Sequence, residues 1–127
     1  MIKAQVHDRF KVFVGPLAHD KSIGKLADQV AAFAKDSRIA AKSIGVEYIE
    51  SLGRLVITLG YRDDEEAYPI KLHSTPLGKI DAMAKDFSQL EAAMAKASGR
   101  YRNIICHELY VTGDREFVMV FMTHEQG

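Results

Sequence analysis

The segment from Arg102 to His124 constrains the fold of this chain more than any other. Two runs rich in β-branched, aromatic and methionine side chains flank a turn at Gly113, which is typical of a β-hairpin. Alternate residues of a strand point to opposite faces, and from Phe117 to Met122 both faces are apolar. Such a strand needs cover on both sides. Because one layer of helices covers a single face, we expect a second sheet, a partner subunit or a ligand on the other.

Composition is that of an ordinary globular protein. The chain has 127 residues, of which 47% are hydrophobic and 27% charged, and 17 basic residues balance 17 acidic ones. This length predicts a single domain over residues 1–127. A formal net charge of zero argues against nucleic acid or an anionic membrane as the main partner. It is compatible with self-association.

A cytoplasmic location is expected. The single cysteine, Cys106, cannot form an intrachain disulfide, so nothing in the cysteine content points to secretion. The first ten residues contain no apolar segment of signal-peptide length. No run approaches the roughly 18 apolar residues of a membrane-spanning helix.

Hydrophobic periodicity predicts the remaining elements. Strands are expected over residues 6–14, 46–50, 54–61 and 68–74, and helices over about 22–36 and 76–97. Asp20 or Ser22 is expected to cap the first helix, and residues 38–43 either continue it or form a turn. Thr75-Pro76 is expected to start the second helix. Pro69 places its strand at a sheet edge or at the strand's beginning.

The elements repeat as strand, helix, strand, strand in two halves, about 6–62 and 68–124. We therefore predict an α+β fold of two tandem β-α-β-β units, with a mainly antiparallel sheet of about six strands and two helices on one face. This order of elements resembles that of ferredoxin-like α+β plaits. Two helices of about 10 Å cover roughly two-thirds of one face of a sheet about 29 Å wide. Dimerisation through the open face is the simplest remedy, and a partly closed barrel is the next.

His73 and His107 are the candidate catalytic residues. Each lies in a strand-like run on a face of mixed character, and the two rings could form a proton-transfer or metal pair if their strands are adjacent. Cys106 precedes His107, but neighbours along a strand point to opposite faces. Cys106 is therefore predicted to fill the core. The carboxylates at 63–66 lack calcium-loop spacing, and no zinc or dinucleotide motif is present, so we predict no metal and no cofactor.

Side chains with a large apolar body on the predicted strands are the candidate ligand-binding residues, because tyrosine adds a polar tip and methionine adapts its shape. They are Tyr48, Tyr61, Tyr110 and Met119.

The favoured function is that of a small homodimeric binding or accessory protein, with an apolar small-molecule cavity between sheet and helices or at the dimer interface. The alternative is a cofactor-independent enzyme of the isomerase or monooxygenase type. In that enzyme His73 or His107 would be the general base and a tyrosine hydroxyl would orient the substrate. The distinguishing feature is whether either imidazole points into a closed cavity with a second polar group in reach.

Overall fold

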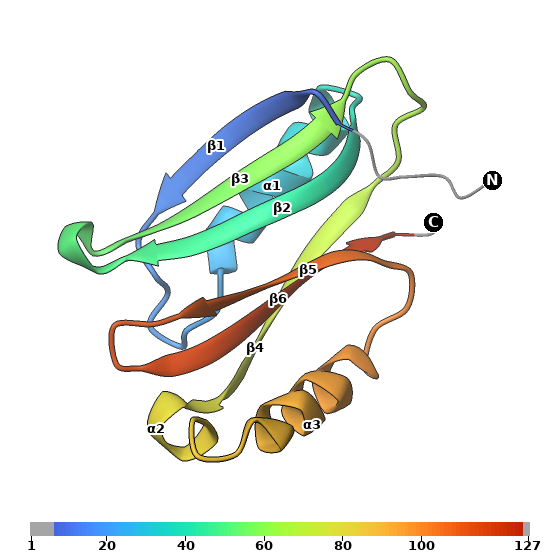
Figure 1. Cartoon of the computed structure of the whole chain (residues 1–127). Helices are drawn as coiled ribbons and strands as arrows, with labels where there is room; N and C mark the ends of the chain where they lie inside the picture. The colour runs from blue at the N-terminus through green and yellow to red at the C-terminus, as the bar shows by residue number, and fades with distance from the viewer. Residues whose placement is uncertain (1–6, 126–127) are drawn as a thin grey trace.

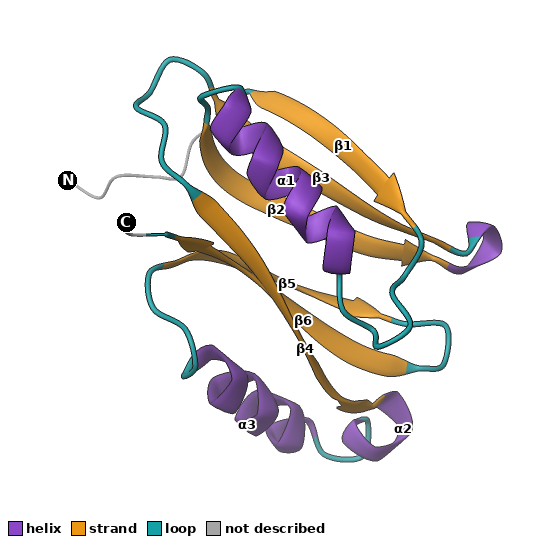
Figure 2. Cartoon of the chain, turned by 180° about the vertical axis from the view of Figure 1, so that it is seen from behind, coloured by secondary structure: helices purple, strands orange, loops and turns teal. Residues whose placement is uncertain are grey.

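The computed structural model describes residues 7–125 and confirms an α+β architecture (Figures 1 and 2). Residue 6, the predicted start of the first strand, lies outside this range. The first half contains β1 (Arg9–Gly15), α1 (Gly24–Asp36), β2 (Ala40–Ile49), the 3₁₀ turn η1 (Glu50–Leu52) and β3 (Arg54–Arg62). The second half contains β4 (Ile70–Lys79), α2 (Ile80–Met83), α3 (Phe87–Ser98), β5 (Ile104–Val111) and β6 (Glu116–His124).

The strands form two antiparallel sheets of three rather than one sheet of six. Sheet A has the order β1-β3-β2 and sheet B the order β4-β6-β5, so the last strand of each half lies in the middle of its sheet. β2 and β5 lie side by side where the sheets meet, but they belong to separate hydrogen-bonded ladders. Both carry a register shift, at Ala41/Ser43 and at Ile104/Cys106. Bulges bend and twist a strand, so neither strand is regular along its whole length.

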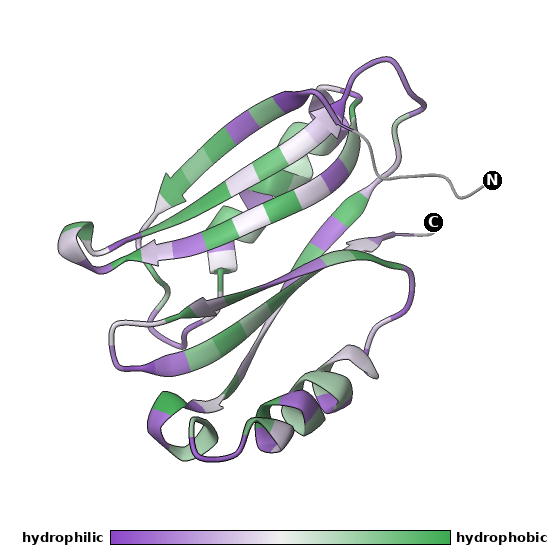
Figure 3. Cartoon of the chain, in the orientation of Figure 1, coloured by the Kyte–Doolittle hydropathy of each residue, from purple (hydrophilic) through white to green (hydrophobic). Residues whose placement is uncertain are grey.

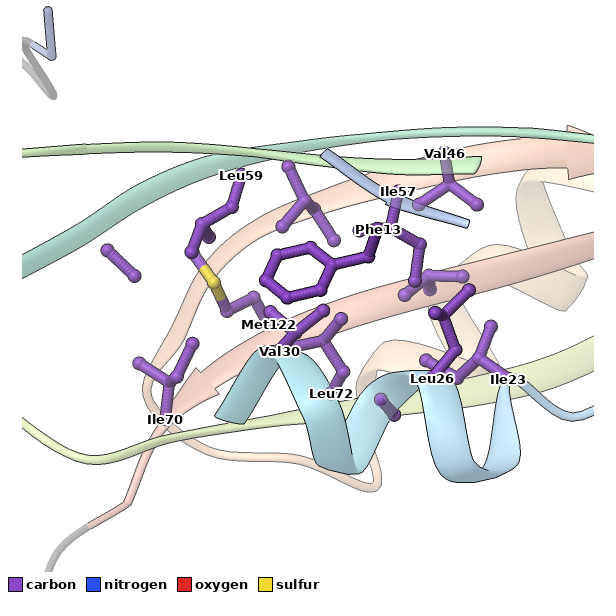
Figure 4. Packing of buried hydrophobic residues seen from close by; sticks show 14 of the residues in the cluster. Phe13, Ile23, Leu26, Val30, Val46, Ile57, Leu59, Ile70, Leu72 and Met122 are labelled. Atoms are coloured by element: carbon purple, nitrogen blue, oxygen red, sulfur yellow. The ribbon is translucent and has the colours of Figure 1, made fainter. Parts of the chain in front are cut away.

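The helices lie on different surfaces, so the prediction of two helices on one face is wrong. α1 packs against sheet A and also contacts β4 of sheet B, whereas α3 lies on the opposite face of sheet B (Figure 2). The first apolar cluster therefore joins both halves. In Figure 4, Met122 and Leu72 of sheet B pack with Phe13, Val30 and Leu59 from the first half.

β6 is covered on both faces from within the chain. Its long hydrophobic run is visible in Figure 3. Val118, Val120 and Met122 belong to the cluster under α1, and Met119 and Phe121 belong to a second cluster under α3. The expectation of two covered faces is confirmed. The hairpin itself needs no partner subunit, because sheet A with α1 supplies one cover and α3 the other.

The second helix begins later than Thr75-Pro76 predicted. β4 runs on to Lys79, with Pro76 opposite Val118 and a register shift before Gly78. β4 is an edge strand of sheet B, where a proline's missing N–H is tolerated. The helix is also broken into α2 and α3, and Asp86 caps α3 by accepting from the Ser88 N–H at 3.0 Å.

The start of α1 and the segment after it also differ from the prediction. α1 has no side-chain cap; Asp20 accepts from the Ser22 N–H at 2.9 Å before the helix begins. After Asp36, residues 37–38 form a turn and β2 begins at Ala40, so a strand replaces most of the helix or turn predicted for residues 38–43. Ala40 and Ala41 are fully buried, and this burial requires an extended segment against the core.

Candidate functional site

His73 lies on the outer face of sheet B, near the end of α3. It is directly opposite Phe121 on β6. Its ring stacks on Tyr101, with centroids 4.2 Å apart and planes 24° apart, and Tyr101 also leans on Phe121 at 5.3 Å. Packing between β4, β6 and the segment after α3 therefore determines the position of this imidazole.

A short hydrogen-bond chain links His73 Nε2 to the backbone of β4. His73 Nε2 lies 3.1 Å from the Thr123 hydroxyl, which lies 3.4 Å from the Lys71 carbonyl oxygen. A hydroxyl has a single proton to donate. If Thr123 donates it to the carbonyl, Thr123 accepts from His73 Nε2–H, and Nδ1 keeps its lone pair.

Burial lowers the pKa of His73 below its usual value of 6.5, because the charged form loses hydration. The nearby charge of Lys71 lowers it further, and Glu125 acts in the opposite direction. His73 is therefore neutral at pH 7. A neutral imidazole of this tautomer can accept a proton or a hydrogen bond at Nδ1.

A pocket of about 300 Å³ opens beside His73. The His124 N–H donates to the Asn103 carbonyl at 2.9 Å, which holds the loop after α3 against the end of β6. Asn103 itself is in the left-handed region with φ 59°, a conformation that asparagine tolerates better than most residues. All residues around this cavity carry polar side chains. This His73 pocket is lined by His73, Arg100, Tyr101, Arg102, Asn103, Thr123, His124 and Glu125.

His107 does not join this pocket. It is exposed on β5 and lies opposite the same Phe121 residue that faces His73. The central strand β6 separates the two imidazoles by two strand spacings, roughly 10 Å between backbones. The adjacency that a paired-histidine site requires is therefore absent.

The four candidate ligand-binding residues are dispersed. Tyr110 is buried and its hydroxyl lies 3.4 Å from the Lys21 carbonyl oxygen; burial raises its pKa to about 12. Tyr48 and Tyr61 pack against the same cluster from β2 and β3, and Met119 lies under α3 on the other face of sheet B. These residues do not surround one common cavity in the described part of the chain.

Cys106 is partly buried and packs against the main apolar cluster, in line with the predicted core role. Burial raises the pKa of its thiol to about 11. The thiolate is the nucleophilic form, and burial disfavours it here.

A second cavity, of about 460 Å³, lies at the start of α1. The Ile23 N–H, at 3.3 Å from the Ser74 hydroxyl, ties this region to β4. Apolar lining comes from Pro16, Ala18, Ile23 and Leu26. This cavity is the described place that best suits an apolar small molecule.

Sequence reasoning missed most of the His73 pocket. Arg100, Tyr101, Arg102 and Asn103 follow α3 directly. A signal was present in the sequence, namely two arginines around a tyrosine just after Gly99. These residues form a site only because their loop lies against the end of β6, and this long-range contact cannot be predicted from the local sequence.

Across residues 7–125, no three side chains of His, Cys, Asp or Glu come together in a way that could hold a metal ion. None of the helices in the described part of the chain is long and apolar enough to cross a bilayer. No protein-family model, curated protein or solved structure matches this chain.

Proposed function

We propose that this protein is a small homodimeric binding protein and that its ligand site is the His73 pocket. The observation that carries the proposal is that several polar side chains, with the aromatic ring of Tyr101, converge on this pocket, because convergent polar groups fix the orientation of a bound small molecule. Binding is favoured over catalysis because the recorded hydrogen-bond partner of His73 is the Thr123 hydroxyl. A threonine hydroxyl is not a proton donor or acceptor of the kind that acid–base catalysis needs at neutral pH.

Self-association is assigned to β1. This strand lies at the edge of sheet A, and Phe10, Val12 and Val14 on its outer face are 67%, 56% and 56% exposed. An exposed apolar edge strand is a template for pairing with another chain. A second copy of the same strand would pair with the free backbone groups of this edge.

The charges on β1 permit antiparallel pairing about a two-fold axis at Val12. Phe10 would then face Val14 of the second copy, and Lys11 would face Phe13. No two like charges would be opposite each other, which removes the usual penalty against such a pair. The apolar side chains of both copies would form one continuous stripe.

Light scattering across a dilution series tests the dimer. The wild-type chain is expected to show twice the chain mass at micromolar concentration, and Val12→Lys is expected to be monomeric because it places two charges at the axis. Leu52→Lys, at a 66% exposed apolar residue on η1, is the matched control and should stay dimeric. A wild-type monomer at micromolar concentration would remove the proposed assembly.

The second candidate is a cofactor-independent enzyme with His73 as general base. It is favoured by the lone pair on Nδ1 of a neutral imidazole beside a pocket. Mass spectrometry of small molecules retained by the purified protein separates the two functions. A retained compound that is unchanged after prolonged incubation supports binding, whereas its conversion by the wild type and not by His73→Gln supports catalysis.

A further inference from the structure

We infer that the ligand of the His73 pocket is a small molecule carrying an oxyanion, a phosphate or a carboxylate group, held by Arg100 and Arg102. This inference rests on the proposed binding function and specifies the chemistry of its ligand. Both arginines line the pocket, together with Asn103.

The cationic surface extends beyond the pocket. Arg100 also lines an adjoining hollow of about 290 Å³ between β4 and α3, where Lys96 and the polar side chain of Thr75 are found. The two hollows therefore share one arginine. An elongated ligand could place its anionic group at Arg100 and Arg102 and the rest of its body along β4.

The two arginines are not neutralised within the described chain. The ion pairs recorded between residues 7 and 125 use other cations, and neither Arg100 nor Arg102 takes part in one. Glu125 is the single carboxylate on the pocket wall. Since Lys71 is also close enough to affect His73, cationic side chains outnumber carboxylates among the described residues around the site.

The helix dipole does not by itself explain this arrangement. Cations near the end of a helix interact favourably with its C-terminal carbonyls, and Lys96 lies in the last turn of α3. Arg102 lies four residues beyond Ser98, the last residue of α3, and it lines the cavity. A guanidinium presents a planar fork of donors that matches carboxylate and phosphate oxygens.

The neutral groups are placed to complete the site. Asn103 and Tyr101 can donate hydrogen bonds from the same wall. In the tautomer that donates from Nε2 to Thr123, His73 Nδ1 carries a lone pair and would repel an anion until it takes a proton. Binding of an oxyanion is therefore expected to raise the pKa of His73, since a nearby negative charge favours imidazolium. Lys71, Arg100 and Arg102 oppose that rise, and Glu125 supports it.

Calorimetric titration of the full chain with pyrophosphate and with citrate tests the inference. We expect saturable binding of at least one of them. Tighter binding of pyrophosphate would indicate a phosphate ligand, and tighter binding of citrate a carboxylate ligand. Arg100→Gln and Arg102→Gln should each weaken it about tenfold, the order of magnitude of one lost charge-assisted hydrogen bond. Arg102→Lys, which keeps the charge and loses the fork, should fall between Arg102→Gln and the wild type.

Arg54→Gln is the matched control. Arg54 is exposed at the start of β3, beside η1 and at the end of sheet A far from the pocket (Figure 1). The substitution Arg54→Gln removes the same charge and should leave the affinity for the anion unchanged. An equal loss of affinity in this variant would show that the anion is attracted by the overall charge of the protein, and would contradict a specific site at Arg100 and Arg102.

Two further results separate this inference from the proposed function. NMR titration should show the His73 pKa rising with ligand occupancy in the wild type, an effect that loss of fold stability does not produce. If neither anion binds at 10 mM and the protein retains a neutral compound instead, the ligand does not carry an oxyanion, but the proposed binding function is supported. Absence of any ligand would remove both.

Discussion

At the scale of single residues, the properties of His73 come from its neighbours. Tyr101 stacks on one face of the ring and Thr123 lies at Nε2. His107, on the same face of the sheet, lacks this enclosure and is exposed. Two histidines with similar sequence surroundings therefore have different environments, and His73 is the one that lines the pocket after α3.

The lowered pKa of His73 predicts a pH-dependent stability. Above pH 6.5, the usual value for this group, His73 is neutral in both the folded and the unfolded chain. As the pH falls below that value, the unfolded chain binds a proton first, so the free energy of unfolding decreases until the lower pKa of the folded state is reached. Urea unfolding at several pH values should show this decrease in the wild type.

His73→Gln supplies the comparison, because glutamine keeps polarity and does not titrate. The wild type should lose more stability than His73→Gln between pH 7 and pH 5. A larger loss in the variant would mean that His73 is stabilised in its charged form, contrary to its burial.

At the scale of elements, β6 is the strand on which both apolar clusters depend. Val118, Val120 and Met122 serve one cluster and Met119 and Phe121 the other. β1 has the opposite character, since one of its faces is exposed in the single chain. Both strands are rich in apolar residues, and they differ in cover, since clusters lie on both faces of β6 whereas the side chains on the outer face of β1 remain exposed.

Truncating a buried side chain on either face of β6 should therefore lower the free energy of unfolding, whichever face is changed. Phe121 and Met122 are 1% and 0% exposed, and replacing either with alanine should lower the free energy of unfolding by about 2–5 kcal/mol. Leu52→Ala, at an exposed site, should change it by less than about 0.5 kcal/mol. Urea denaturation measures all three. If either core variant matched Leu52→Ala, that face of β6 would be open to water.

At the scale of the whole molecule, the two halves share a strand order and do not have separate cores. The main cluster takes Leu26 and Val30 from α1 and Leu72, Val120 and Met122 from sheet B. α1 lies between sheet A and β4 (Figure 2). The halves share one apolar cluster, so we expect them to fold together although their elements repeat.

Residues 1–66 and 67–127 expressed separately test this dependence. Each fragment would expose its share of the common cluster, and chains of about 60 residues bury too little surface for a secure margin of stability. We expect neither fragment to show a cooperative thermal transition by circular dichroism, and an equimolar mixture to recover one. A cooperative transition in either fragment alone would contradict the shared core.

Patterns within short segments were enough for much of the secondary structure. The hairpin of β5 and β6, the strand β3, the end of α1 near Asp36 and the repeated order of elements were all predicted from periodicity and turn residues. Pro76 is an exception. It was read as a helix start and lies in an edge strand, since a proline suits both and only the position in the sheet distinguishes them.

Local sequence therefore established the elements and the need to cover both faces of β6, because apolar periodicity is a property of consecutive residues. The split into two sheets, the separate positions of α1 and α3, and the separation of His73 from His107 by Phe121 came from the folded chain. Strand order and bulges are set by which distant segments pack together. The His73 pocket belongs to the same class, since His73 and Arg102 meet only when the end of α3 lies against β4 and β6.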